Sequence, residues 1–179
     1  MREIDRLTTE KYGIPSILLM ENAAHAAARV ITKKLGGSVA EKFFLILCGK
    51  GNNGGDGAAL ARILWMQGAN CFVYLFGKIE DTKDDAKVNF EILKKVTESR
   101  KSYSNWLFLA EIETAQALAQ ILVMGKEHIL VDAFFGTGLS RPIEGELIHF
   151  FIMFSGLVSR NKTLFTLSLI HISEPTRPY

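Results

Sequence analysis

A short apolar run stands directly before a glycine-rich segment in the stretch FFLILCGKGNNGGDG, which extends from Phe43 to Gly57. A continuous apolar run of this length is typical of a parallel strand that is buried on both faces. Residues 58–67 then show the apolar spacing of a helix. We therefore predict a strand, a glycine-rich loop over residues 49–57 and a helix. In that order, the backbone N–H groups at the start of the helix can hold a phosphate group.

The same alternation of strands and helices extends through the rest of the chain. Two helices, separated by a break at residues 12–15, precede the first strand. The later predicted elements are a strand at 71–76, a helix at 84–97, a weak strand at 106–109, a helix at 114–124 and a strand at 128–131. This alternation implies an α/β fold, a Rossmann-like three-layer sandwich with a mostly parallel sheet and N-terminal helices before it.

The number of glycines in the loop indicates a function beyond a simple turn. Gly49, Gly51 and Gly54 satisfy the pattern GxGxxG, and five of the nine residues 49–57 are glycine. A turn needs one or two glycines, whereas a loop without side chains lets a ligand approach the backbone. The alternative is an Asn-Gly and Asp-Gly turn that only reverses the chain.

Two common nucleotide-binding patterns do not fit this loop. A phosphate-binding loop of the Walker type needs Lys and then Ser or Thr after Gly54, where this chain has Gly55 and Asp56. A dehydrogenase would place an acidic residue about 20 positions further on, at the end of the second strand. The first acidic residue of that region is Glu80, beyond the strand. These differences disfavour phosphoryl transfer and the ordinary redox pose of NAD.

A second glycine-containing loop follows the strand predicted at 128–131. Asp132 stands at its start, and the loop continues through Gly136, Thr137, Gly138, Leu139, Ser140, Arg141 and Pro142. Because ligands of an open α/β sheet bind outside the carboxyl ends of its strands, both loops are expected at one edge, in a shared cleft. The alternatives are a turn cap for Asp132 and a solvated surface charge for Arg141.

Both loops resemble those of the YjeF N-terminal family, the NAD(P)H-hydrate epimerases. The matching motifs are NNGGDG at residues 52–57 and VDAxFG at residues 131–136, and MREID at 1–5 and LMENAA at 19–24 resemble the leading helices of the family. The similarity extends to about Glu146. The resemblance implies a Rossmann-like homodimer that binds a potassium ion and interconverts the R and S forms of hydrated NADH and NADPH. It also implies a fused or separate NAD(P)H-hydrate dehydratase as a partner.

The resemblance assigns site residues in both loops. Asn53 and Asp132 match potassium ligands, and their amide and carboxylate oxygens are hard donors suited to a hard cation. Asp56 and Asp132 are the carboxylates expected to act as acid and base. The residues that match substrate-binding positions are Asn52, Asn53, Gly54, Gly55 and Asp56 in the first loop and Gly136 to Pro142 in the second.

The C-terminal part departs from the family, which has Asp-Ile-Pro-Ser-Gly at the end of the next strand. Residues 167–177 instead read LSLIHISEPTR, the in-frame translation of a transposase mosaic-end sequencing adapter. We therefore expect an incomplete native domain over residues 1–166 and an adapter-derived tail over 167–179, in which His171 has no role. We also expect the 179-residue chain to be poorly soluble or weakly stable, with negligible epimerase activity, and the completed gene product to be active.

Composition limits the other classes of function. Hydrophobic residues make up 48% of the chain, which is typical of a globular protein. The 21 basic and 19 acidic residues are interspersed, so nucleic acid and membrane are not expected as partners. A charged N-terminus and the absence of an apolar run of about 20 residues favour a cytoplasmic protein. Cys48 and Cys71 lack a CxxC or His-rich context and are predicted to be reduced packing residues.

Two other functions remain as alternatives to epimerisation. The first is a non-catalytic nucleotide-binding or dimerising scaffold module of the same fold, against which the presence of Asn53 and Asp132 argues. The second is an ordinary nicotinamide oxidoreductase, against which the missing ribose-binding acid argues.

Overall fold

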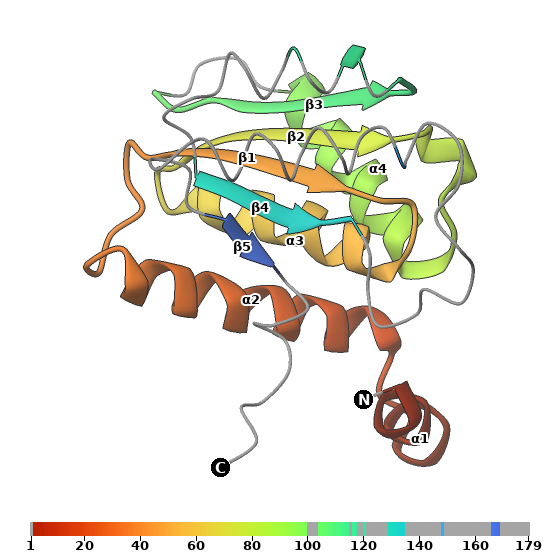
Figure 1. Ribbon diagram of the computed structural model, residues 1–179. Helices are drawn as coiled ribbons and strands as arrows, with labels where there is room; N and C mark the ends of the chain where they lie inside the picture. Colours follow the sequence, from red (N-terminus) through yellow and green to blue (C-terminus); the bar gives the residue numbers. More distant parts are fainter. Residues whose placement is uncertain are drawn as a thin grey trace.

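The computed structural model describes residues 2–99, 104–114, 116–117, 120, 129–134, 148 and 166–168 (Figure 1). Its elements, in chain order, are α1 Arg2–Tyr12, α2 Ser16–Lys34, β1 Phe43–Cys48, α3 Asn52–Met66, β2 Asn70–Phe76, the short 3₁₀ helix η1 Ile79–Asp81, α4 Asp84–Ser99, β3 Leu107–Ile112, β4 Ile129–Ala133 and β5 Thr166–Ser168. From β1 to β3, strands and helices alternate as the sequence predicts.

The five described strands form one parallel sheet in the order β3-β2-β1-β4-β5. The chain passes outward from β1 on one side through β2 to β3, and on the other side through β4 to β5 (Figure 1). Cys48, the last residue of β1, lies in register with Leu75 of β2 and Ala133 of β4. The carboxyl ends of these strands therefore share one edge. The order reverses between β1 and β4, which is where α/β sheets bind ligands.

Helix α3 packs against β1, β2 and β4 and lies between α2 and α4 (Figure 1). The core beneath it is built from alternate residues of β1, namely Phe44, Ile46 and Cys48, all with no exposed surface. Leu45 and Leu47 on the other face of β1 are only 1% exposed. The prediction of a strand buried on both faces is confirmed, and it explains why residues 43–48 are apolar without alternation.

The N-terminal helices end and begin where the sequence predicts a break. Helix α1 ends at Tyr12, Gly13 has a positive φ of 68°, and Pro15 precedes the first residue of α2. The positive φ favours glycine, and proline is suited to the start of a helix because its missing N–H has no helical acceptor there. No helix of the described residues has the length and apolar character needed to cross a membrane.

Some predicted boundaries are wrong. Helix α3 begins at Asn52 rather than at residue 58, so most of the predicted loop is helical. Strand β3 continues to Ile112, three residues beyond its predicted end. The helix predicted at 114–124 lies mostly outside the described residues. Strand β5, at Thr166–Ser168, pairs in parallel with β4. The division of the chain at residue 166 stays a prediction.

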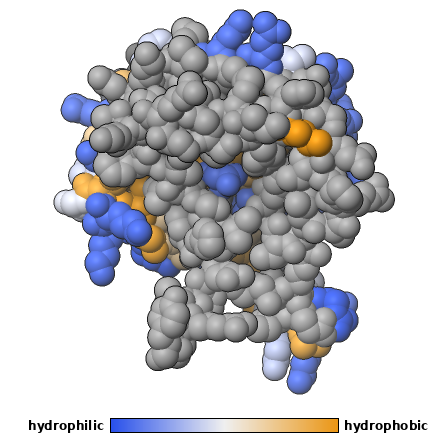
Figure 2. All heavy atoms as spheres, viewed as in Figure 1, coloured by the Kyte–Doolittle hydropathy of each residue, from blue (hydrophilic) through white to orange (hydrophobic). Residues whose placement is uncertain are grey.

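Figure 2 shows hydrophilic residues, in blue, at several separate places around the described part of this face.

Candidate functional site

The chain leaving β1 contacts the chain leaving β4 at the carboxyl edge of the sheet. Gly49 N donates a hydrogen bond to Ala133 O at 3.2 Å, and a Cβ atom at Gly49 would overlap the carbonyl oxygen of Phe134. The prediction that the two loops start at one edge of the sheet is confirmed. Gly136 to Pro142 lie outside the described residues, so the shared cleft stays a prediction.

Glycines in the first turns of α3 allow close packing. A Cβ atom at Gly54 would overlap the carbonyl oxygen of Gly49, and one at Gly57 would lie 2.7 Å from Ala133 Cβ and 2.8 Å from Cys48 Sγ. Packing inside the protein is therefore sufficient to explain why residues 54 and 57 are glycine, and the approach of a ligand to this backbone stays a prediction. Their small size lets α3 begin directly on the ends of β1 and β4. Gly51 differs, because no atom lies within 4 Å of a Cβ placed there.

The start of α3 provides the anion-binding property predicted for the loop. Gly51 is the N-cap residue and no side chain caps the helix. The first turn closes with a hydrogen bond from Gly55 N to Gly51 O at 3.1 Å. The amides before Gly55 have no carbonyl of the same helix to bond, and the helix dipole favours negative charge there. A phosphate group is suited to this position.

Three predicted polar residues stand in these first turns. Asn53 is buried, with 8% of its surface exposed, Asp56 is partly buried, and Asn52 is exposed. Asn53 and Asp56 each make an interaction within the protein. Because residues three apart lie on neighbouring parts of a helix surface, these two side chains belong to the same end of α3. The sequence motif identifies them correctly as residues of the sheet edge.

Asp132 lies on β4, at the switch point of the sheet. Its Oδ1 atom accepts a hydrogen bond from the backbone N–H of Phe134 at 3.0 Å. Burial raises the pKa of the Asp132 carboxyl above its ordinary value, and the hydrogen bond from Phe134 partly opposes the shift. Asp132 therefore caps a turn, as the alternative interpretation predicts. Its carboxyl group is also partly shielded from water near the end of β4.

Cys48 shows that the two carboxylates share one neighbourhood. Burial raises the pKa of its thiol most, and the charges of Asp132 and then Asp56 raise it further. Both carboxylates therefore act on one sulfur atom at the end of β1. Cys48 and Cys71 are free and buried, as predicted. In the sequence Cys48 stands immediately before the glycines, and this position indicates that it borders the site.

Lys50 occupies the edge next to the candidate site and was not identified from the sequence. Its aliphatic chain covers Gly77, where a Cβ atom would lie 2.7 Å from Lys50 Cδ. Its Nζ atom is 3.5 Å from Asp81 Oδ2. The end of β2 is where a dehydrogenase would hold the adenosine ribose. Here a lysine side chain covers that position, which agrees with the missing acid in the sequence.

The donors of the site are a side-chain amide and carboxylates. The described residues contain no group of three or more His, Cys, Asp or Glu side chains that could hold a metal ion. Amide and carboxylate oxygens, such as those of Asn53 and Asp132, suit a hard cation of low charge.

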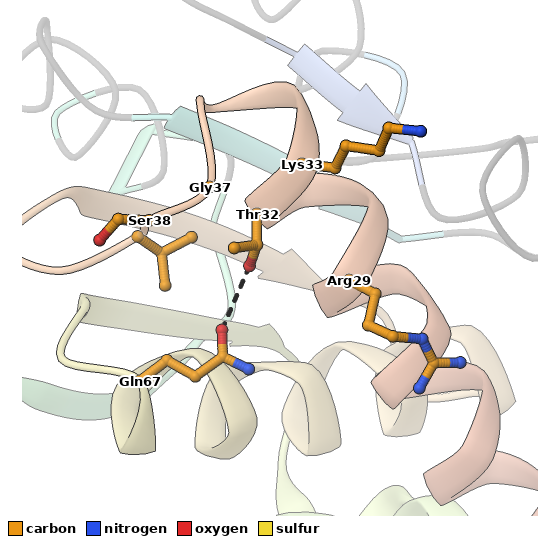
Figure 3. A pocket seen from close by; sticks show the side chains of 7 residues that line it. Arg29, Thr32, Lys33, Gly37, Ser38 and Gln67 are labelled. Carbon is orange, nitrogen blue, oxygen red and sulfur yellow. Dashed lines mark hydrogen bonds between the residues drawn. The ribbon is translucent and has the colours of Figure 1, made fainter.

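A hollow of about 530 Å³ opens at the opposite edge of the sheet (Figure 3). Its lining residues are Arg29, Thr32, Lys33, Gly37, Ser38, Val39 and Gln67. Gln67 follows the last residue of α3, and Val39 precedes β1. The hollow is thus separate from the strand ends that carry Asp56 and Asp132. Figure 3 shows Arg29 and Lys33 pointing in different directions, so they do not converge on one ligand.

Relatives of known name match most of the chain. A bifunctional NAD(P)H-hydrate repair enzyme Nnr of Moorella thermoacetica is 41% identical over 145 residues, which are 81% of this chain and 26% of the relative. An NAD(P)H-hydrate epimerase of Rhodopirellula baltica is 32% identical over 81% of this chain and 53% of the relative. One of Anaerococcus prevotii is 33% identical over 81% and 61%. The chain thus spans about a quarter of the bifunctional relative and just over half of the epimerases.

The fold also matches a solved structure. A crystal structure of the yeast protein YNL200c superposes with a TM-score of 0.65, covering 94% of this chain and 66% of that chain at 23% identity. This likeness supports the Rossmann-like architecture. The sequence profile described as "YjeF-related protein N-terminus" matches residues 16–161. Because that match covers most of the chain, from the start of α2 through both strand-end loops, the chain belongs to the family of YjeF-related protein N-termini.

Proposed function

We propose that this protein interconverts the R and S forms of hydrated NADH and NADPH. The observation that carries the proposal is the placement of Asp56 and Asp132 on different strand-end segments, both close enough to Cys48 to raise its pKa. Relatives over four fifths of the chain are named for NAD(P)H-hydrate epimerisation or repair, which supports the same reaction here.

The reaction inverts one carbon of the hydrated nicotinamide ring. The C–O bond beside the ring nitrogen breaks, its electron pair leaves with oxygen, and a proton from an acid releases that oxygen as water. The nitrogen lone pair forms an iminium. Water then adds to the opposite face and gives its proton to a base. Asp132, whose pKa is raised by burial, is suited to hold or accept this proton, while the Asp56 carboxyl group, at the same end of α3, would stabilise the iminium cation.

The two loops would bind the rest of the substrate. The backbone amides at the start of α3 suit the pyrophosphate, and the side chains of Asn52 and Asn53 can donate to its oxygens. We assign substrate binding to Asn52–Asp56 and to Gly136–Pro142. The assignment of the second segment rests on the family resemblance alone.

A potassium ion is proposed at Asn53 and Asp132. Asn53 stands in the first turn of α3 and Asp132 on β4, and both offer oxygen ligands of the kind that a hard cation prefers. The ion would supply a fixed positive charge that holds substrate oxygens in place. A dependence of the activity on potassium over sodium is the expected consequence.

We further propose a homodimer that works in the cytoplasm with an NAD(P)H-hydrate dehydratase. The names of the bifunctional relatives support a link to hydrate repair. The scaffold alternative would need no carboxylates at the strand ends, so the presence of Asp56 and Asp132 favours the enzyme. The oxidoreductase alternative is disfavoured because Lys50 covers the ribose position at the end of β2.

The direct test is to supply the purified R hydrate and to follow the S hydrate by NMR or chromatography. The protein encoded by the complete gene and the 179-residue chain are assayed side by side, with an enzyme-free sample for the spontaneous rate. The proposal predicts that the complete gene product brings the epimers to equilibrium well before the enzyme-free sample. Equal rates with and without that protein would reject epimerisation, and bound but unchanged hydrate would favour the scaffold.

A further inference from the structure

A polar cluster joins α2, α3 and α4 on a face of α3 that leads to the candidate site. Arg62 follows Gly55 by seven residues, which is about two turns along the same face of the helix. Its Nη2 atom donates hydrogen bonds to Glu21 Oε1 of α2 and, at 2.6 Å, to Asn89 Oδ1 of α4. One arginine on α3 thus holds both neighbouring helices.

The ion pair in this cluster is shielded from solvent. The side chains of Arg62 and Glu21 are 15% and 28% exposed, and Asn89 is fully buried. The other ion pairs recorded among the described residues have both side chains more than half exposed. Shielded charges are screened less by water and salt, and the planar guanidinium accepts only a narrow range of partner positions. The cluster is therefore suited to fixing geometry.

Met20 connects the cluster to the first turns of α3. Its Sδ atom accepts a hydrogen bond from Asn89 Nδ2 at 3.1 Å. A Cβ atom placed on Gly55 would lie 2.9 Å from this sulfur atom. The same Cβ atom would lie 2.7 Å from Ala86 Cα of α4. Helices α2 and α4 thus touch α3 without room for a methyl group, at a residue that stands between Asn53 and Asp56.

We propose that Glu21 and Arg62 are positioning residues for the candidate site. With Asn89 and Met20 they fix the rotation of α3 and its displacement along the helix axis. This in turn places the polar residues of the first turns of α3 against Asp132. The kinetic consequence rests on the proposed function, whereas the structural consequence can be measured without it.

The chain offers a matched control for ordinary helix packing. Thr32 Oγ1 donates to Gln67 Oε1 at 3.2 Å, which joins α2 to the end of α3 at the opposite edge of the sheet (Figure 3). Thr32→Val removes this bond and keeps a side chain of similar volume. It loosens the same pair of helices away from Gly55.

The experiment compares Glu21→Met, Arg62→Met, Arg62→Lys and Thr32→Val in the protein encoded by the complete gene. Steady-state kinetics give kcat and KM for hydrate epimerisation, and thermal unfolding gives the stability. Hydrogen exchange reports the backbone amides of residues 52–57. We expect Glu21→Met and Arg62→Met to lower kcat by about tenfold or more, because small displacements of reacting groups have large effects. KM should change by less than kcat, and Arg62→Lys should recover part of the loss.

In the same two variants, the backbone amide hydrogens of residues 52–57 should exchange with solvent faster than in the parent protein, at a temperature where the protein is fully folded. Thr32→Val should leave kcat and those amides unchanged, even if its Tm falls. If Arg62→Met does not fold, Glu21→Met alone still decides, because it keeps the length of the side chain and removes the oxygen that accepts from Arg62. Unchanged kcat and unchanged exchange at residues 52–57 in Glu21→Met would overturn the proposal. If the parent protein does not epimerise hydrates, the proposed function fails, and hydrogen exchange still tests positioning.

Discussion

Gly57 of α3 lies so close to Ala133 of β4 that a Cβ atom on the glycine would be 2.7 Å from the alanine Cβ. Gly57→Ala should therefore push α3 away from the strand ends, although alanine is the better helix former. We expect a loss of about 1–3 kcal/mol in the free energy of unfolding, the usual range for overpacking. Urea unfolding measures this loss.

Gly51→Ser is the matched control for this prediction. Gly51 has φ −90° and ψ −172°, which any residue adopts, and no atom lies within 4 Å of its Cβ position. Serine also caps helices well, so the stability should stay within about 0.5 kcal/mol or rise slightly. A Gly57→Ala protein as stable as Gly51→Ser would show that α3 does not rest on β4 as described.

Asp132→Asn should stabilise the protein at neutral pH in potassium-free buffer. Burial raises the pKa of Asp132 in the folded state, so the folded protein binds this proton more tightly than the unfolded chain. The free energy of unfolding therefore falls as pH rises from the ordinary value of 3.8 through the raised folded-state pKa. Asparagine removes this loss and still accepts the hydrogen bond from Phe134.

Urea unfolding at pH 7 and at the lowest pH where both proteins fold measures the difference. The advantage of Asp132→Asn should shrink as the pH falls towards 3.8. Asp81→Asn, at an exposed position, serves as the control. An Asp132→Asn protein that is less stable than its parent at pH 7 would show that the carboxylate is stabilised in the folded state.

Neither cysteine should react while the protein is folded. Cys48 and Cys71 have no exposed surface, and burial raises the pKa of both thiols, so the reactive thiolate is scarce. Iodoacetamide at pH 8 should label them on the order of 100-fold more slowly than in guanidinium, because labelling needs local opening. Mass spectrometry of the two peptides follows the reaction. Fast labelling of folded Cys48 would place the thiol in solvent.

The strands and the helical lead-in could be predicted because their signals are local. The apolar run at 43–47, the break at 12–15 and the positions of Asp56 and Asp132 near the carboxyl ends of strands are indicated by neighbouring residues only. The start of α3 could not be predicted, because Asn52 to Gly57 have poor helix propensity. In the folded protein Gly54 packs against Gly49, and Gly57 packs against Cys48 and Ala133. The contact with Ala133 joins parts of the chain that are far apart in the sequence, so local patterns do not reveal it.

Sequence patterns also could not predict the polar cluster of Glu21, Arg62 and Asn89 or the contact of Lys50 with Gly77. Glu21, Arg62 and Asn89 are separated by 41 and 27 residues, and only the packing of three helices brings them together. Lys50 is a single charge in a glycine-rich segment, and its contact with Gly77 depends on the neighbouring strand. Such arrangements follow from tertiary structure and leave no periodic signal.

The most direct test of the site is the epimerisation rate of the complete gene product and of its Asp56→Asn and Asp132→Asn variants. Both changes should lower kcat by about 100-fold or more if the carboxylates act as acid, base or charge stabiliser. Asp132→Asn should also abolish the dependence on potassium, and Asp81→Asn should retain the parent rate. Parent-like rates and potassium dependence in both site variants would contradict an epimerisation site at the ends of β1 and β4.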